Sequence, residues 1–422
     1  MNVFQKFPYF FLMLNLFFCL VICQSKPSPR YQQVSTLIGT KLYFFGGRTN
    51  VTTNEVWYLD LPNLFSIDTP PWHSDGGMPA GYRFGGPCVS PIDNFTVYFV
   101  GGRTSKSNTK TYSYTSSVYA FNSKTSQWIT PNIIGLNSSF ERRNEIQSVI
   151  DNSGKIFSFG GKNFNITGVF NDMNVLDTTT MTWSTLIISQ GVPNSRRIYT
   201  ATLLPTGFIV YIGGYKISMN EILMFDTKSL SWSTKNASGS ALNSRVGQSA
   251  VLTQNKTIII YGGSLTNSTG PQALPDLAVL DTNTWVWSTP SIPQTNAPPP
   301  LTYHSAGIYN DFMIITFGRI TNLSTKPSSN NVYILDTKNY VWVTTIQDAT
   351  ATSKGTTTSK GTTVTSIVIT EHSSSNNNNG IFIGIGVFAS AMVLFAILGF
   401  LIYKKRRQDL IIPTPGTLAN EY

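Results

Sequence analysis

The sequence predicts an all-β protein: a six-bladed β-propeller, followed by a disordered stalk and one transmembrane helix. Three observations support this prediction. A short apolar run ending in glycine recurs six times, a tryptophan follows each run, and one long uncharged stretch lies near the C-terminus. The chain has 422 residues, of which only 12% are charged, so a repeat array or several domains are expected.

The first repeating element is an apolar strand that ends in a double glycine. It reads YFFGG at 43–47 and returns at 98–102, 157–161, 210–214 and 259–263, with a degraded ITFGR at 315–319. The intervals of 55, 59, 53, 49 and 56 residues indicate one structural unit per interval. We interpret the glycines as strand-end positions with positive φ and close packing. They are Gly46, Gly47, Gly101, Gly102, Gly160, Gly161, Gly213, Gly214, Gly262, Gly263 and Gly318, and Arg319 is interpreted as replacing the second glycine of the last unit.

The second repeating element is a tryptophan that opens the last apolar run of each unit. The six are Trp72, Trp128, Trp183, Trp232, Trp287 and Trp342. In five units an Asp or Asn precedes the tryptophan by six positions, whereas an insertion separates Asp60 from Trp72 in the first. Each unit holds four short runs with turn residues between them, which predicts a four-stranded antiparallel sheet. Six such sheets packed radially bury both faces of each one, as in a β-propeller.

These units resemble kelch repeats, in which a double glycine ends the second strand and a tryptophan opens the fourth. The resemblance covers residues from about 30 to 345 and implies a kelch-type propeller within 24–347. The units run in phase from their first strand. No split blade that would close the ring is therefore evident.

The sequences near the two ends of the chain predict where the protein is located in the cell. Residues 1–23 contain one lysine and an apolar run, as in a secretory signal peptide. Residues 380–403 are 24 residues without a charge, enough for a transmembrane helix, and Lys404 to Arg407 follow directly. The expected localisation is the plasma membrane or a secretory-pathway membrane, as a single-pass type I protein with its N-terminus extracellular or lumenal.

The segments that flank the predicted helix suggest further contacts. Residues 348–379, rich in Ser, Thr and Asn, are expected to form a solvated stalk, and 404–422 a short basic cytoplasmic tail that touches lipid head groups. Gly380 and Gly384 form a small-xxx-small pattern that would support a weak homodimer. N-glycosylation is expected at the sequons of Asn50, Asn94, Asn137, Asn165, Asn236, Asn255, Asn267 and Asn322.

One face of the ring gathers basic residues. Strands alternate in direction, so the loop after each double glycine and the loop entering the next unit emerge on the same face. The candidate ligand-binding residues there are Arg48, Arg83, Arg103, Arg143, Lys162, Arg197, Arg245 and Arg319, with Arg30 and Arg196 at equivalent positions. One interpretation is an extracellular acidic protein or glycan ligand; the other is that these arginines are architectural. The stalk, which follows a fourth strand, is expected to leave from this face.

The sequence favours recognition over catalysis. The net charge of +10 is not gathered in stripes with interleaved aromatics, so no nucleic acid is expected. No cofactor, metal site or catalytic residue is predicted. The alternative is an extracellular or cell-wall oxidase similar to galactose oxidase, whose copper needs two histidines, two tyrosines and a cysteine. The globular part has only two histidines, His73 and His304, and Cys88 is its only thiol.

Overall fold

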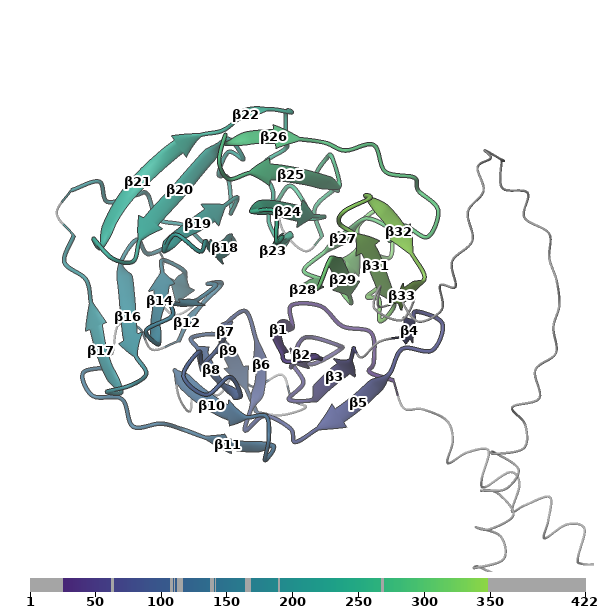
Figure 1. Ribbon diagram of the computed structural model, residues 1–422. Helices are drawn as coiled ribbons and strands as arrows, with labels where there is room; N and C mark the ends of the chain where they lie inside the picture. The colour runs from purple at the N-terminus through teal and green to yellow at the C-terminus, as the bar shows by residue number, and fades with distance from the viewer. Residues whose placement is uncertain are drawn as a thin grey trace, which may run out of the picture. The chain divides into compact units, whose positions relative to one another are not determined.

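Six β-sheets stand like blades around a central axis in the computed structural model of the protein (Figure 1). The structure describes residues 26–347 except 62–63, 107–108, 110, 112–116, 137–139, 141, 164–167, 189 and 267–268. The predicted six-bladed all-β propeller is therefore confirmed. The strand bounds of the blades, which we number one to six along the chain, are as follows.

Blade one contains β1 (Val34–Ile38), β2 (Lys41–Phe45), β3 (Val56–Asp60) and β5 (Trp72–Asp75). Blade two contains β7 (Gly86–Val89), β8 (Thr96–Val100), β10 (Val118–Asn122) and β11 (Gln127–Ile129). Blade three contains β13 (Val149–Ile150), β14 (Lys155–Phe159), β16 (Met173–Asp177) and β17 (Thr182–Thr185).

Blade four contains β18 (Thr200–Leu203), β19 (Phe208–Ile212), β20 (Glu221–Asp226) and β21 (Ser231–Asn236). Blade five contains β23 (Ser249–Leu252), β24 (Thr257–Tyr261), β25 (Leu277–Asp281) and β26 (Val286–Ser288), with β22 (Ser238–Gly239) added parallel to β26. Blade six contains β28 (Ser305–Tyr309), β29 (Phe312–Thr316), β31 (Val332–Asp336) and β32 (Val341–Val343).

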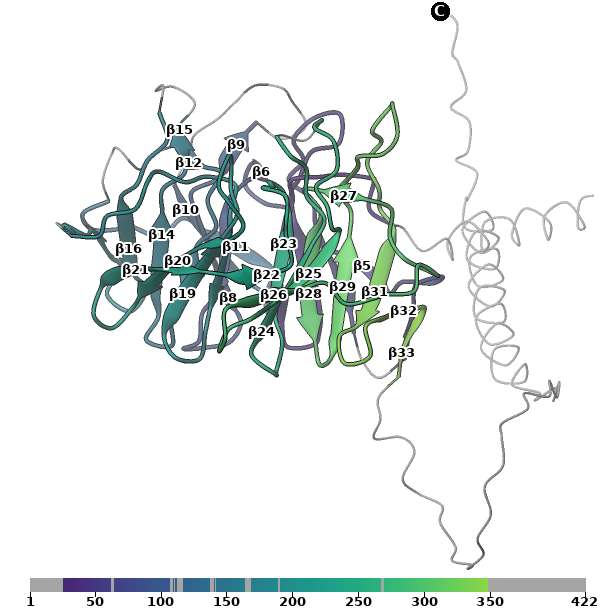
Figure 2. The same ribbon diagram turned by 90° about the horizontal axis from the view of Figure 1, so that it is seen from above.

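Four short antiparallel pairs complete the ring. They are β6 (Gly81–Arg83) with β9 (Arg103–Ser105), β12 (Arg143–Asn144) with β15 (Lys162–Asn163), β27 (Leu301–Thr302) with β30 (Arg319–Ile320), and β4 (Leu64–Ser66) with β33 (Thr345–Gln347). The first three project from the face at which the second strands end (Figure 2). We call this the glycine face, and the other the opposite face.

The core lies between the blades rather than inside one of them. Each second strand has four consecutive buried residues, because both of its faces are covered by neighbouring sheets. In β2, for example, Leu42 and Phe44 belong to the cluster shared with blade six, and Tyr43 and Phe45 to the cluster shared with blade two. The outer strands are more exposed, as in β21.

The second glycine of each pair links one blade to the next. Its N–H donates to a carbonyl just before the first strand of the following blade, at 2.7–3.2 Å. The six pairs are Gly47 to Tyr82, Gly102 to Arg143, Gly161 to Arg196, Gly214 to Arg245, Gly263 to Leu301 and Gly318 to Arg30. The first glycine allows this approach, since a Cβ on Gly46 would lie 2.1 Å from the Tyr82 carbonyl oxygen.

The last unit is phased differently from the sequence-based interpretation. Gly318 makes the hydrogen bond of a second glycine, so the residue that departs from the pattern is Phe317, not Arg319. Phe317 keeps the left-handed φ of a first glycine, 62°. Its buried ring packs against Phe44 of blade one at a centroid distance of 5.2 Å. The aromatic side chain thus fills the interface between the last and first blades, and that packing offsets the strain of its backbone.

A second ring of contacts surrounds the axis. One residue shortly before each first strand has a left-handed φ of 53–68°, two positions before it in five blades and four positions before it in blade three; the six are Gln32, Phe84, Glu145, Ile198, Gly247 and Tyr303. Backbone N–H groups in this set donate to the carbonyl of the preceding blade, from Gln32 to Tyr303, Glu145 to Phe84, Ile198 to Glu145 and Tyr303 to Gly247. Neighbouring blades are therefore held together at the axis by the main chain.

The ring closes without a blade shared between the two ends of the chain, since every four-stranded blade is contiguous in sequence. Blade six reaches blade one through Gly318 and Arg30, through Gln32 and Tyr303, and through the Gln33 side chain, which donates to Ser305 Oγ at 2.8 Å. The pair β33/β4 adds a clasp, with Ile346 opposite Phe65.

The tryptophans lie in the fourth strands and pack against the preceding blade. Trp128 Nε1 donates to the Gly76 carbonyl at 3.1 Å, and Trp287 Nε1 to Met219 at 3.0 Å. The rings of Trp72 and Phe317 are 5.5 Å apart. These indoles stabilise the blade interfaces by apolar burial and by one hydrogen bond each where their N–H is bonded.

The end of the last blade differs from expectation. The chain does not continue from its fourth strand toward the glycine face, because β33 pairs with β4 of the β3–β5 connection. Figure 2 shows β33 at the opposite face. The predicted signal peptide, stalk, transmembrane helix and tail lie outside the described residues. Among the described residues, no helix is long and apolar enough to cross a membrane.

Candidate ligand-binding face and central channel

Four arginines of the predicted binding set and its equivalents are buried inside the glycine face. They precede the first strands, and each reaches the carbonyl of its own blade's first glycine; the pairs are Arg30 with Gly46, Arg143 with Gly160, Arg196 with Gly213 and Arg245 with Gly262. Their side chains are 0–2% exposed. This placement corrects the expectation that Arg143 and Arg245 face a ligand: their guanidinium groups satisfy carbonyls that the left-handed turns leave without partners.

Carboxylates neutralise three of these arginines. Glu55, Asp172 and Glu221 occupy equivalent positions at the start of the third strands and bond Arg30, Arg143 and Arg196 at 2.5–2.6 Å. Burial raises the pKa of Asp172, but the hydrogen bond and charge of Arg143 outweigh it and hold the pKa below its usual value. The sequence analysis did not predict this pairing, although an acid recurs at the first residue of the third strand or one residue before it in each unit that has the arginine.

Two further arginines of the predicted set turn toward the axis. Arg83 is 3% exposed and donates to Gln32 Oε1 at 2.5 Å. Arg197 is 18% exposed, pairs with Glu145 at 2.5 Å and lies 4.4 Å from the Tyr215 ring centroid. Both contact neighbouring blades, so their side chains are largely used within the ring.

The remaining basic residues of the set are less buried than the four arginines described first. Arg48, Arg103, Lys162 and Arg319 are the residues that directly follow the second glycines of blades one, two, three and six. Their main chains pair with the segments entering the first strands of their blades. Arg48 is exposed and the other three are half-buried, and Arg319 stacks 4.9 Å from the Tyr31 ring. Because blades six, one, two and three are neighbours, these residues form one arc, which we call the basic arc.

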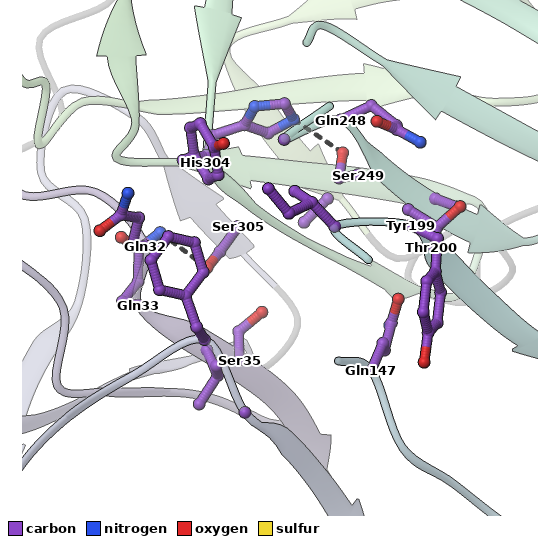
Figure 3. A pocket seen from close by; sticks show the side chains of 18 of the residues that line it. Gln32, Gln33, Ser35, Gln147, Tyr199, Thr200, Gln248, Ser249, His304 and Ser305 are labelled. Atoms are coloured by element: carbon purple, nitrogen blue, oxygen red, sulfur yellow. Dashed lines mark hydrogen bonds between the residues drawn. The ribbon is translucent and has the colours of Figure 1, made fainter. Parts of the chain in front are cut away.

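Apolar side chains from several blades meet at the axis near the glycine face, next to a cavity. Phe84 and Tyr303, from blades two and six, meet edge to face at 5.6 Å, and Ile198 packs with them. These residues also line a cavity of about 180 Å³ whose walls combine polar and apolar side chains (Figure 3). A second, wider space of about 470 Å³ continues between the first strands, where Ser35 and Ala250 line both.

The cavity contains a neutral histidine. Ser249 Oγ and His304 Nε2 are 2.7 Å apart and share a hydrogen bond (Figure 3). Nδ1 of His304 has no hydrogen-bond partner among the described residues. Burial lowers the pKa of His304 to about 3. The imidazole is thus uncharged at neutral pH, and its site disfavours positive charge.

The residues considered for an oxidase are not brought together. His73 lies in the outer strand β5 and stacks on Tyr58 at 4.9 Å, whereas His304 lies at the axis. Cys88 is a free, buried thiol in β7, and burial raises its pKa. Among the described residues, no cluster of three or more His, Cys, Asp or Glu could hold a metal ion.

The sequons that the structure describes are accessible. Asn50, Asn236 and Asn322 are exposed at the glycine face, and Asn94 and Asn255 are exposed in turns at the opposite face. Asn137, Asn165 and Asn267 lie outside the described residues. Five side chains are therefore placed where a glycan could be attached, and glycosylation stays a prediction.

Comparison with known proteins identifies the repeats. The KLHDC2/KLHL20/DRC7 Kelch-repeats domain matches residues 15–214 and 199–374. The chain is also similar to Kelch domain-containing protein 3 of Homo sapiens, with 28% identity over 194 residues, 44% of this chain and 48% of that protein. The match thus spans about half the length of that relative. A six-bladed propeller whose repeats match this domain along most of the chain belongs to the kelch-repeat family, as a propeller of the kind that serves as a protein-binding scaffold.

Proposed function

We propose that the protein is a membrane-anchored recognition protein that binds an acidic protein segment on the glycine face of its propeller. The basic arc carries this proposal. Three of the carboxylates on that face are bonded to buried arginines, and the basic arc brings four basic residues together at the same face, which favours a positive potential there. An acidic segment would gain electrostatic steering and charge-assisted hydrogen bonds there.

The proposed location rests on the sequence. A signal peptide at 1–23, a span at 380–403 and the flank from Lys404 to Arg407 favour a type I protein of the plasma membrane or secretory pathway. The last described strand, β33, lies at the face opposite the basic arc (Figure 2). Protease protection on intact cells, together with a mobility shift after glycosidase treatment, tests this topology.

A binding screen tests the recognition role. The secreted fragment 24–347 is screened against surface proteins and, separately, against glycans. For the ligand found, we then compare Arg48→Glu/Arg319→Glu with Lys228→Glu/Lys256→Glu, which reverses exposed lysines on the opposite face. The first variant should lose at least about tenfold in affinity and the second almost none. Equal affinities would exclude the basic arc, and selective glycan binding would replace the protein ligand.

The proposed role is not catalytic. The alternative, an oxidase similar to galactose oxidase, is tested by assaying hydrogen peroxide release from sugars and alcohols after copper loading. Turnover that depends on His304 and His73 would overturn the recognition role in favour of the enzyme. We propose no cofactor.

A further inference from the structure

Blade five has the same arginine and acid as blades one, three and four, but in blade five the two are not bonded to each other. The residue two positions before the left-handed turn and the residue at the start of the third strand vary together around the ring. The six combinations are Arg30 with Glu55, Tyr82 with Ser117, Arg143 with Asp172, Arg196 with Glu221, Arg245 with Asp276, and Leu301 with Asn331. An arginine always occurs with an acid, yet only three of these four pairs are bonded.

In blade five the arginine is occupied elsewhere. Arg245 donates to the carbonyls of Leu274 at 2.9 Å and Pro275 at 2.8 Å, in addition to Gly262 at 3.0 Å. Asp276 accepts a hydrogen bond from Gln272 Nε2 on Oδ1, at 2.5 Å. Within the described residues, its other carboxylate oxygen has no hydrogen-bond partner. Asp276 is therefore a half-buried acid that makes no salt bridge to Arg245, unlike the equivalent acids of blades one, three and four.

This carboxylate lines a cavity of about 150 Å³ between blades five and six. Tyr261 and Trp342 form the aromatic part of the wall, with ring centroids 5.6 Å apart. The proline-rich connection at 289–300 forms the other side, and the Tyr261 hydroxyl holds it by donating to the Pro298 and Pro299 carbonyls at 3.3 Å. The cavity thus combines apolar and aromatic walls with one acid.

We propose that this cavity binds a cationic group, the ammonium or guanidinium of a lysine or arginine side chain on a protein partner. The carboxylate offers a charge-assisted hydrogen bond, and the aromatic and proline walls fit an alkyl stem. An anionic group would be repelled by Asp276, and a neutral group would gain no charge-assisted hydrogen bond from it. The site is distinct from the basic arc because it needs the opposite charge.

Small probes test the site independently of any partner. The full-length protein is titrated by calorimetry with n-butylammonium and n-butylguanidinium, and with n-pentanol as a neutral probe of similar size. The cations should bind at least about tenfold more tightly than the alcohol. Asp276→Asn should abolish this preference, whereas Glu221→Gln, which changes an acid paired with Arg196, should keep it. Equal binding of all three probes, or a preference that survives in Asp276→Asn, overturns the proposal.

A second measurement on the unmodified protein does not depend on a variant folding. Burial raises the pKa of Asp276, and the charge of Arg245 does not outweigh it. Titration of the Asp276 carboxyl by ¹³C NMR should give a pKa above the ordinary range, and it should fall when n-butylguanidinium is added. A pKa already below that range without a probe would mean that Arg245 fills the site, and would overturn the proposal.

Discussion

The N–H of Gly318 donates to the carbonyl oxygen of Arg30 at 2.9 Å, and this hydrogen bond joins the last blade to the first. It has the same geometry as the five bonds between blades that are consecutive in the chain. The seam of the ring is therefore built like every other interface, but no peptide connection crosses it. Its stability depends on contacts alone, which makes the clasp β33/β4 the obvious element to remove.

Removing the clasp should weaken the ring. We compare the fragment 24–344 with 24–347, which differ only by Thr345, Ile346 and Gln347. Ile346 is 3% exposed, so its loss alone should lower the free energy of unfolding by about 2–5 kcal/mol. Urea unfolding monitored by tryptophan fluorescence measures the difference. Identical midpoints would show that β33 does not support the seam.

A glycine can be required by a left-handed φ or by the close approach of a neighbouring group, and substitutions at two glycines can separate these two requirements. Gly39 and Gly46 have nearly the same φ, 59° and 62°, but a Cβ on Gly39 would meet nothing within 4 Å. Gly39→Ala should lower the free energy of unfolding by about 1–2 kcal/mol, the cost of the left-handed conformation. Gly46→Ala should cost more than about 3 kcal/mol, because the Tyr82 carbonyl must also move. Equal effects in thermal unfolding would contradict the close-packing role.

Two equivalent acids should respond to neutralisation with opposite signs. Asp172→Asn leaves the buried Arg143 without its counter-charge and should lower the free energy of unfolding by about 2–3 kcal/mol at pH 7. The raised pKa of Asp276 means that the folded state holds this proton more tightly than the unfolded chain, so the ionised carboxylate opposes folding at neutral pH. Asp276→Asn should therefore raise the melting temperature. A decrease would show that this acid is compensated.

His304 should make stability depend on mild acid. Its pKa is lowered from 6.5 to about 3 in the fold, so below pH 6.5 the unfolded chain binds a proton that the folded protein does not. The stabilisation is complete above pH 6.5 and should fall by about 2 kcal/mol between pH 6.5 and 5. Equilibrium unfolding at both values tests this. His304→Asn should remove most of the pH dependence, while the exposed His73→Gln should retain it.

The sequence predicted the ring because its strongest signals are backbone requirements. The double glycine permits the approach between Gly46 and Tyr82, and the acid six positions before a tryptophan caps a hairpin, as Asp281 does by accepting from the N–H groups of Asn283 and Thr284. These local requirements recur in every unit, so they appear in the sequence as a regular repeat.

The remaining features depend on contacts between distant residues. The role of Arg143 was misassigned because its partner Asp172 lies 29 positions away, with the Gly-Gly strand between them. Phe317 was misplaced because only the hydrogen bond of Gly318 fixes the register. The pairing of β33 with β4 joins residues 345–347 to 64–66, and no pattern in the local sequence predicts it. Charge alone therefore located the face but did not distinguish its buried arginines from its exposed ones.

The clasp also determines how the ring would carry a mechanical load. A pull on the chain beyond Gln347 acts first on β33, whose partner β4 belongs to the first blade. Tension is thus transferred across the seam to blade one instead of peeling β32 from the outside of blade six. Once those three residue pairs separate, the next element under load is the short strand Val341–Val343, which is held by blade six alone. Under force, the structure would therefore break first at the seam between blade six and blade one.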